Sequence, residues 1–133
     1  PEGFVGHIVI EDNILHFDEV EIVEWDDQER VKELGLNESE FPNGYTIIHK
    51  EQEEKTFELT DDTIYTFTDV YHFFISEPES NSLYTTTKKD EFLNHLGEYN
   101  LNDVPLSKQT LPYFIEIKDG KVISITERFK YTI

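Results

Sequence analysis

The chain has 133 residues, 29 acidic against 11 basic side chains, a net charge of −18, and neither Cys nor Met. This length fits a single domain, and 37% hydrophobic residues with ten Phe and seven Tyr supply large side chains for one core. The negative field disfavours nucleic acid and anionic membrane surfaces, and no apolar run could span a bilayer, so we expect one globular domain over residues 1–133.

Two apolar stretches, residues 4–10 and 14–25, flank a tight-turn signal at Asp12-Asn13. Asp and Asn tolerate the left-handed conformation of a two-residue turn, so this pattern predicts a β-hairpin. The resulting register places four apolar side chains on one face: Ile8, Ile10, Leu15 and Phe17. After Asp18 the apolar positions change parity, which indicates a bulge or bend.

The middle of the chain predicts helices and short strands. Asp26 or Asp27 can cap a helix over about 27–36 that ends near Gly35, and residues 88–99 predict a second helix with Phe92 and Leu96 inward. Strand patterns cover residues 45–49, 56–59, 64–67 and 70–75.

The last predicted hairpin joins residues 113–117 to 121–129. Its turn is expected to be the three-residue bulged type over Lys118-Asp119-Gly120, with Ile123 and Ile125 on the buried face. Together these elements predict an α+β fold with a mainly antiparallel sheet and two short helices. The parity change at Asp18 and the need to protect strand edges favour a sheet that curls, or closes into a small barrel.

One set of side chains could bind a metal ion. In the predicted first hairpin His7 lies opposite Asp18 and diagonal to His16, on the face away from Phe17. Two imidazoles and a carboxylate are ligands that divalent metals accept, although the same pattern also suits a half-buried sheet face where His only packs. The other histidines, His49, His72 and His95, show no ligand spacing and are predicted to be surface or packing residues.

Motifs for catalysis and cofactors are missing from the sequence. Without Cys there is no thiol nucleophile, and no GxSxG, HExxH or phosphate-binding loop occurs. Carboxylates are too abundant for their number to indicate acid–base catalysis, and no acidic run matches the EF-hand pattern for calcium. We expect a non-enzymatic binding module without a cofactor. The alternatives are a module that binds or senses a divalent metal ion and, after it, a small carboxylate-based hydrolase.

Aromatic side chains offer a second kind of candidate site. Aromatic clusters can bind sugars or peptides, and the candidates here are Trp25, Tyr45, Tyr71 and Tyr113. The alternative is that each side chain packs on the core beside a turn, as in Phe41-Pro42-Asn43-Gly44-Tyr45.

The same turns carry a resemblance to a known family. The motifs that carry it are residues 21–25, the helix with Glu33-Leu34-Gly35-Leu36, the turn Pro42-Asn43-Gly44-Tyr45, Tyr113-Phe114 and Asp119-Gly120-Lys121-Val122-Ile123. With these motifs the chain resembles a family of small uncharacterised secreted proteins and predicted lipoproteins of Gram-positive bacteria. The resemblance covers most of the chain, but its motifs are turn and packing signatures that imply no activity. It implies an extracytoplasmic domain, secreted or lipid-anchored through a removed N-terminal segment, that binds a protein or small ligand outside the membrane.

Overall fold

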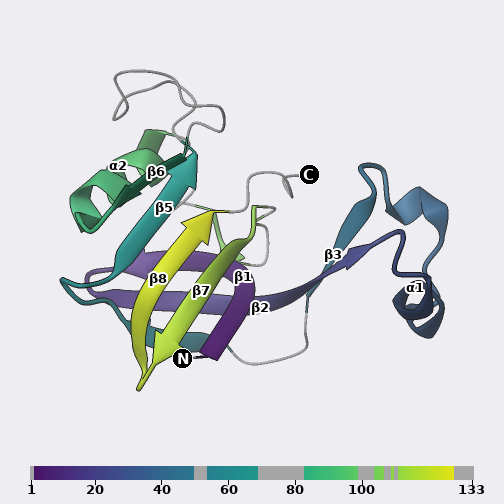
Figure 1. Cartoon of the computed structure of the whole chain (residues 1–133), viewed down its shortest axis with the longest axis horizontal. Coiled ribbons are helices and arrows are strands. Elements are labelled where there is room, and N and C mark those ends of the chain that lie inside the picture. Colours follow the sequence, from purple (N-terminus) through teal and green to yellow (C-terminus); the bar gives the residue numbers. More distant parts are fainter. Residues whose placement is uncertain are drawn as a thin grey trace.

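The computed structural model describes residues 2–49, 54–68, 83–98, 104–106, 109 and 111–127. Within these residues the fold has eight β-strands, two α-helices and one short 3-10 helix. Figure 1 shows a curled sheet with one helix beside it and a two-stranded arm that extends to a second helix. The predicted α+β class with a mainly antiparallel sheet is confirmed. The strand predicted over 70–75 lies outside the described residues.

The elements follow one another with short connections. In chain order they are β1 (Glu2–Glu11), β2 (Ile14–Glu24), α1 (Gln28–Leu34), η1 (Glu38–Glu40), β3 (Tyr45–His49), β4 (Lys55–Glu58), β5 (Ile64–Thr68), β6 (Leu83–Thr86), α2 (Lys89–Glu98), β7 (Tyr113–Lys118) and β8 (Lys121–Glu127). Neither described helix is long and apolar enough to cross a membrane.

The sheet closes on itself through β4. The strand order is β3-β2-β1-β7-β8-β5-β6, and β4 pairs with both β2 and β8, so β2, β1, β7, β8 and β4 form a ring. The closing contact is narrow, because β4 and β8 share the single pair Glu58 and Lys121. Pairing is antiparallel except where β8 meets β4 and β5. The predicted curling of the sheet is therefore confirmed, and we call this ring the barrel.

The first hairpin has the predicted turn and register. Asp12 adopts a left-handed φ of 53°, and Glu11 pairs with Ile14. Ile8 pairs with Phe17 and Ile10 with Leu15, and all four side chains are buried in the main core. Alternation along both strands therefore directs this apolar set to the inside of the barrel, as predicted.

Both strands of this hairpin change partners at one point. Gly6 pairs with Glu19 of β2 and with Tyr113 of β7, and the preceding residues of β1 continue along β7 alone. Beyond Glu19, β2 pairs with β3 from Val20 to Glu24. The approach at Gly6 is close, since a Cβ there would lie 2.2 Å from the Asp18 carbonyl oxygen. The parity change predicted at Asp18 marks this exchange of partners.

The arm consists of β3 and the second half of β2, and it carries α1 and a small core of its own. Val23, Val31 and Phe41 are buried there, and Trp25 packs against Phe41 with ring centroids 5.2 Å apart. The predicted first helix is confirmed: Asp27 caps its N-terminus, and Gly35 ends it at a left-handed φ of 65°.

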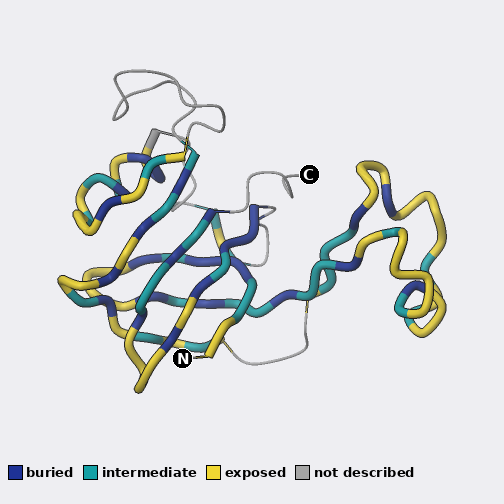
Figure 2. The backbone as a smooth tube through the Cα atoms, in the orientation of Figure 1, coloured by how far each residue is buried: buried dark blue, intermediate teal, exposed yellow. Residues whose placement is uncertain are grey.

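The main core fills the barrel and the space under α2. Figure 2 shows buried positions along the barrel strands, interrupted by less buried ones, and others within α2. Phe92 and Leu96 of α2 are 0% and 1% exposed, and the Phe92 ring stacks on Tyr65 at 4.9 Å. The predicted inward face of the second helix is therefore confirmed.

The last hairpin differs from the prediction in its turn. Lys118 pairs with Lys121, so the loop has two residues, Asp119 and Gly120, with φ of 54° and 76°. Positive φ at both positions is typical of a type I′ turn, whose twist matches that of the flanking strands. The register shift falls between Glu116 and Ile117 instead, and it buries Val122 in place of the predicted Ile123.

Candidate metal centre

Three side chains from three strands converge where β1, β2 and β3 meet. His7 of β1 lies opposite Asp18 of β2, as predicted. His49 of β3 pairs with Val20, which lies two residues after Asp18 and on the same face of β2. One ligand atom from each of His7, Asp18 and His49 lies within 4.8 Å of the other two. Among the described residues, this is the one group of three or more His, Asp or Glu side chains that converges in this way.

His7 is buried with its polar atoms unsatisfied. The residue is 0% exposed, and neither ring nitrogen has a hydrogen-bond partner among the described residues. The pKa of His7 is lowered to about 4, mainly by burial and then by nearby His49, while Asp18 acts in the opposite direction. The imidazole is therefore neutral at pH 7, and one nitrogen presents a lone pair that no described group uses.

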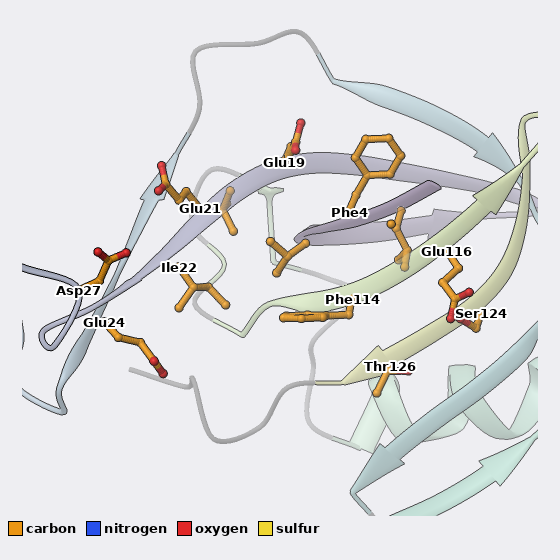
Figure 3. Close-up of a pocket in the computed structure, with 14 residues that line it drawn as sticks. Phe4, Glu19, Glu21, Ile22, Glu24, Asp27, Phe114, Glu116, Ser124 and Thr126 are labelled. Atoms are coloured by element: carbon orange, nitrogen blue, oxygen red, sulfur yellow. Dashed lines mark hydrogen bonds between the residues drawn. The ribbon is translucent and has the colours of Figure 1, made fainter. Parts of the chain in front are cut away.

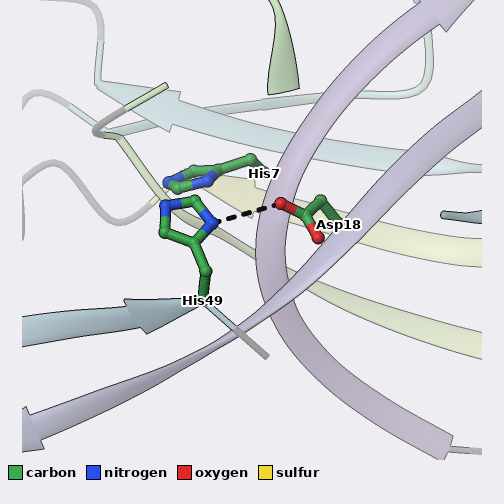
Figure 4. Close-up of side chains that lie close together, drawn as sticks. All are labelled: His7, Asp18 and His49. Atoms are coloured by element: carbon green, nitrogen blue, oxygen red, sulfur yellow. Dashed lines mark hydrogen bonds and ion pairs between the residues drawn. The ribbon is translucent and has the colours of Figure 1, made fainter. Parts of the chain in front are cut away.

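His49 and Asp18 form the accessible side of the cluster. His49 Nδ1 lies 3.2 Å from Asp18 Oδ2, and the side chains are 45% and 21% exposed. The His7 and His49 rings are 5.2 Å apart between centroids and inclined by 46°. Figure 4 shows the His7 ring above the His49 ring, with Asp18 beside both. The cluster thus has a buried ligand at its base and two ligands that solvent can reach.

The spacing suits a small ion after a modest adjustment. Zinc binds imidazole nitrogen and carboxylate oxygen at about 2.0–2.2 Å, which places tetrahedral ligands about 3.3–3.5 Å from one another. The 3.2 Å between Asp18 and His49 already matches that spacing. The upper limit of 4.8 Å for the group exceeds it by about 1.4 Å, a distance that small side-chain rotations can close.

The histidine set differs from the one predicted from the sequence. His16 is not part of the cluster: its Nδ1 lies 2.8 Å from Glu54, and its Nε2 lies 3.9 Å from Glu11. His49, expected to be a surface or packing residue, takes its place beside His7. A sequence signal for His49 does exist. The second half of β2 has apolar residues that require a partner strand, and His49 lies on the next strand along the chain, which can supply that pairing.

His95 is a packing residue, as predicted. Its ring stacks on Phe67 with centroids 4.1 Å apart, and its Nε2 lies 2.6 Å from Glu127 Oε2. Both side chains of this pair are almost fully buried, at 4% and 1% exposed. His72 lies outside the described residues.

The candidate aromatic residues do not form one exposed surface. Tyr113 is 2% exposed in the main core, where burial, and then Glu127, raises its pKa well above the usual value. Tyr45 is 6% exposed, and Trp25 packs in the arm against Phe41. These three therefore contribute to packing, and Tyr71 lies outside the described residues.

Comparisons with known proteins add no family to this description. No family model matches the chain, and no curated protein or solved structure matches it either.

Proposed function

We propose that the protein binds a divalent transition-metal ion, of which Zn²⁺ is the best example, through His7, Asp18 and His49. The proposal is supported above all by His7, a buried side chain whose ring nitrogens have no partner among the described residues and which lies beside two further potential ligands, Asp18 and His49. Leaving a polar group buried and unpaired costs about 1–3 kcal/mol. An ion would satisfy the lone pair of His7 and use the two accessible ligands at the same time.

The ligand types favour some ions over others. Two imidazoles with one carboxylate suit Zn²⁺, Ni²⁺, Co²⁺ and Fe²⁺, whereas Ca²⁺ and Mg²⁺ prefer sites made entirely of oxygen. Neutral His7 is already in its ligand form at pH 7, since burial holds its pKa near 4. A hydrolytic role for the carboxylates alone has no comparable support.

Thermal unfolding with and without metal tests the proposal. Metal-free protein is titrated with ZnCl₂, NiCl₂ and CaCl₂, and each titration is reversed with EDTA. An ion at a hundredfold excess over its dissociation constant stabilises the folded protein by about 2.7 kcal/mol. We expect this stabilisation with Zn²⁺ and Ni²⁺, and a much smaller effect with Ca²⁺.

Two histidine variants locate the site. His49→Ala removes an accessible ligand and should abolish the zinc stabilisation while leaving the metal-free protein folded. His16→Ala is the matched control, because His16 also lies beside carboxylates but outside the cluster. Zinc stabilisation that survives in His49→Ala, or that disappears in His16→Ala, contradicts the proposed ligand set.

A further inference from the structure

A cleft opens where β1 and β2 separate. The two strands pair with each other as far as Gly6 of β1 and Glu19 of β2. Beyond this point the N-terminal part of β1 pairs with β7, and the C-terminal part of β2 pairs with β3. The space between them has a volume of about 750 Å³ and extends over the outer surface of β7 and β8 to Ser124 and Thr126. Figure 3 shows the acidic side chains of β2 on one side of this cleft and Phe114 with Glu116 on the other. This volume is typical of ligand sites.

One edge of β2 faces the cleft. The Trp25 amide donates to the Gly44 carbonyl in continuation of the pairing between β2 and β3, so the odd-numbered residues of this segment direct their backbone groups to β3. Backbone groups alternate between the two edges of a strand. Val20, Ile22 and Glu24 therefore direct their N–H and C=O groups away from β3. No second described strand pairs with β2 over this segment.

The lining of the cleft combines apolar and acidic side chains. Ile22 and Phe114 supply apolar surface, and five carboxylates line the cleft without any Lys or Arg: Glu19, Glu21, Glu24, Asp27 and Glu116.

Among the described residues, Lys55 lies 3.3 Å from Glu19 and Arg30 lies 2.7 Å from Glu21. Asp27 and Glu116 accept hydrogen bonds from uncharged groups, the backbone amide of Arg30 and the hydroxyl of Ser124. Because the lining itself has five carboxylates and no Lys or Arg, its charge complements a cationic occupant.

We propose that this cleft binds an extended basic peptide, which adds to β2 as a strand along Val20–Glu24. A strand edge gives a peptide main-chain hydrogen bonds, and side chains at alternate positions give it specificity. Five residues of β2 span about 17 Å, enough for a peptide of five or six residues. Lys or Arg side chains at alternate positions meet the carboxylates, and the apolar side chains between them contact Ile22 and Phe114. This inference does not depend on the metal site.

Fluorescence anisotropy with a labelled peptide tests the charge component. The probe is carboxyfluorescein-labelled Lys-Val-Lys-Phe-Lys-Val, titrated with the full chain at low salt, and the same peptide with Glu in place of Lys is the negative control. The variant Glu24→Gln/Glu116→Gln should bind the probe about tenfold more weakly, as expected if about 1.4 kcal/mol is lost. The matched variant Glu40→Gln/Glu58→Gln removes the same charge from exposed positions outside the cleft and should bind like the unmodified protein.

Backbone methylation of the probe tests strand addition. Two peptides are compared, with N-methyl groups on the alternate amides of one edge or of the other. An added strand uses one edge only, so one methylated peptide should lose binding while the other keeps it. Peptide binding should also slow hydrogen exchange of the Ile22 amide. The proposal is overturned if the lysine probe shows no saturable binding, if both methylated peptides bind equally, or if the two double variants bind alike.

Discussion

Replacement of His7 by leucine should stabilise the metal-free protein. Leucine is close to histidine in volume and carries no polar atom, so His7→Leu keeps the packing and removes two unsatisfied nitrogens from a fully buried position. Unsatisfied buried groups cost about 1–3 kcal/mol, and we expect the free energy of unfolding at pH 7.5 to rise by that amount. This is opposite to the usual result of changing a buried residue.

The gain can be expressed as a melting temperature. At about 2.1 cal/mol/K per residue, unfolding of 133 residues has an entropy of about 0.28 kcal/mol/K. A gain of about 1–3 kcal/mol therefore raises the melting temperature by about 4–11 °C. The same variant should show no zinc stabilisation, so stability without metal and metal binding change in opposite directions.

The advantage of His7→Leu should grow in acid. The pKa of His7 is about 4 in the folded protein and 6.5 in the unfolded chain, so between these values the unfolded chain binds a proton that the folded protein does not. The unmodified protein therefore loses stability as the pH falls from 6.5 to 4, by up to about 3 kcal/mol, and His7→Leu does not share this loss.

Urea unfolding followed by circular dichroism in EDTA, repeated from pH 7.5 to 4, measures these differences. His16→Leu is the control, since the His16 ring has a hydrogen-bonding partner in Glu54 and its replacement should not give the gain at pH 7.5. A His7→Leu protein that is less stable than the unmodified one at pH 7.5, or whose advantage does not grow as the pH falls, would refute the reasoning about the buried imidazole.

Three further changes have defined outcomes in the same urea assay. Gly6→Ala should destabilise the fold by about 3 kcal/mol or more, because the new Cβ would meet the backbone of Asp18 at 2.2 Å. His95→Leu should cost about 1–3 kcal/mol, since it leaves the buried Oε2 of Glu127 without its partner at 2.6 Å while the Thr68 amide still donates to Oε1. Glu91→Gln should weaken the loss of stability below pH 4.5, because hydrogen bonds hold the folded-state pKa of that carboxyl below its usual value and their contribution is lost on protonation.

Each of these changes has its own control or contrary result. Gly3→Ala places a Cβ no closer than 4.0 Å to its nearest neighbour, so it should be far milder than Gly6→Ala, and equal effects would contradict the close approach. For His95→Leu, unchanged stability would show that Glu127 is satisfied in another way. For Glu91→Gln, an acid profile identical to that of the unmodified protein would remove the role assigned to its hydrogen bonds with Thr86 and Tyr84.

Local features of the sequence were sufficient where the contacts are local. The turn at Asp12-Asn13 fixes the register of β1 and β2, and that register alone places His7 opposite Asp18. The cap at Asp27 and the left-handed Gly35 likewise specify the first helix.

The features that escaped prediction depend on contacts between distant segments. His49 lies 31 residues from Asp18, and its place is set by how β3 pairs with β2 after β1 has turned away. Closure of the sheet through Glu58 and Lys121 is equally remote in sequence. The last turn was predicted one residue too long because the extra residue lies in β8, at Ile123, where the register shifts opposite Glu116 and Ile117. The resemblance to secreted proteins stays a prediction.

The arm divides the ligands of the candidate metal centre between two cores. His7 belongs to the barrel, whereas His49 ends β3 of the arm, whose core among the described residues has three buried side chains, Val23, Val31 and Phe41. Small cores open more readily than large ones, so the arm is expected to exchange its amide hydrogens before the barrel does. An ion held by both histidines would act as a crosslink, and its residence time would then be governed by how often the arm unfolds.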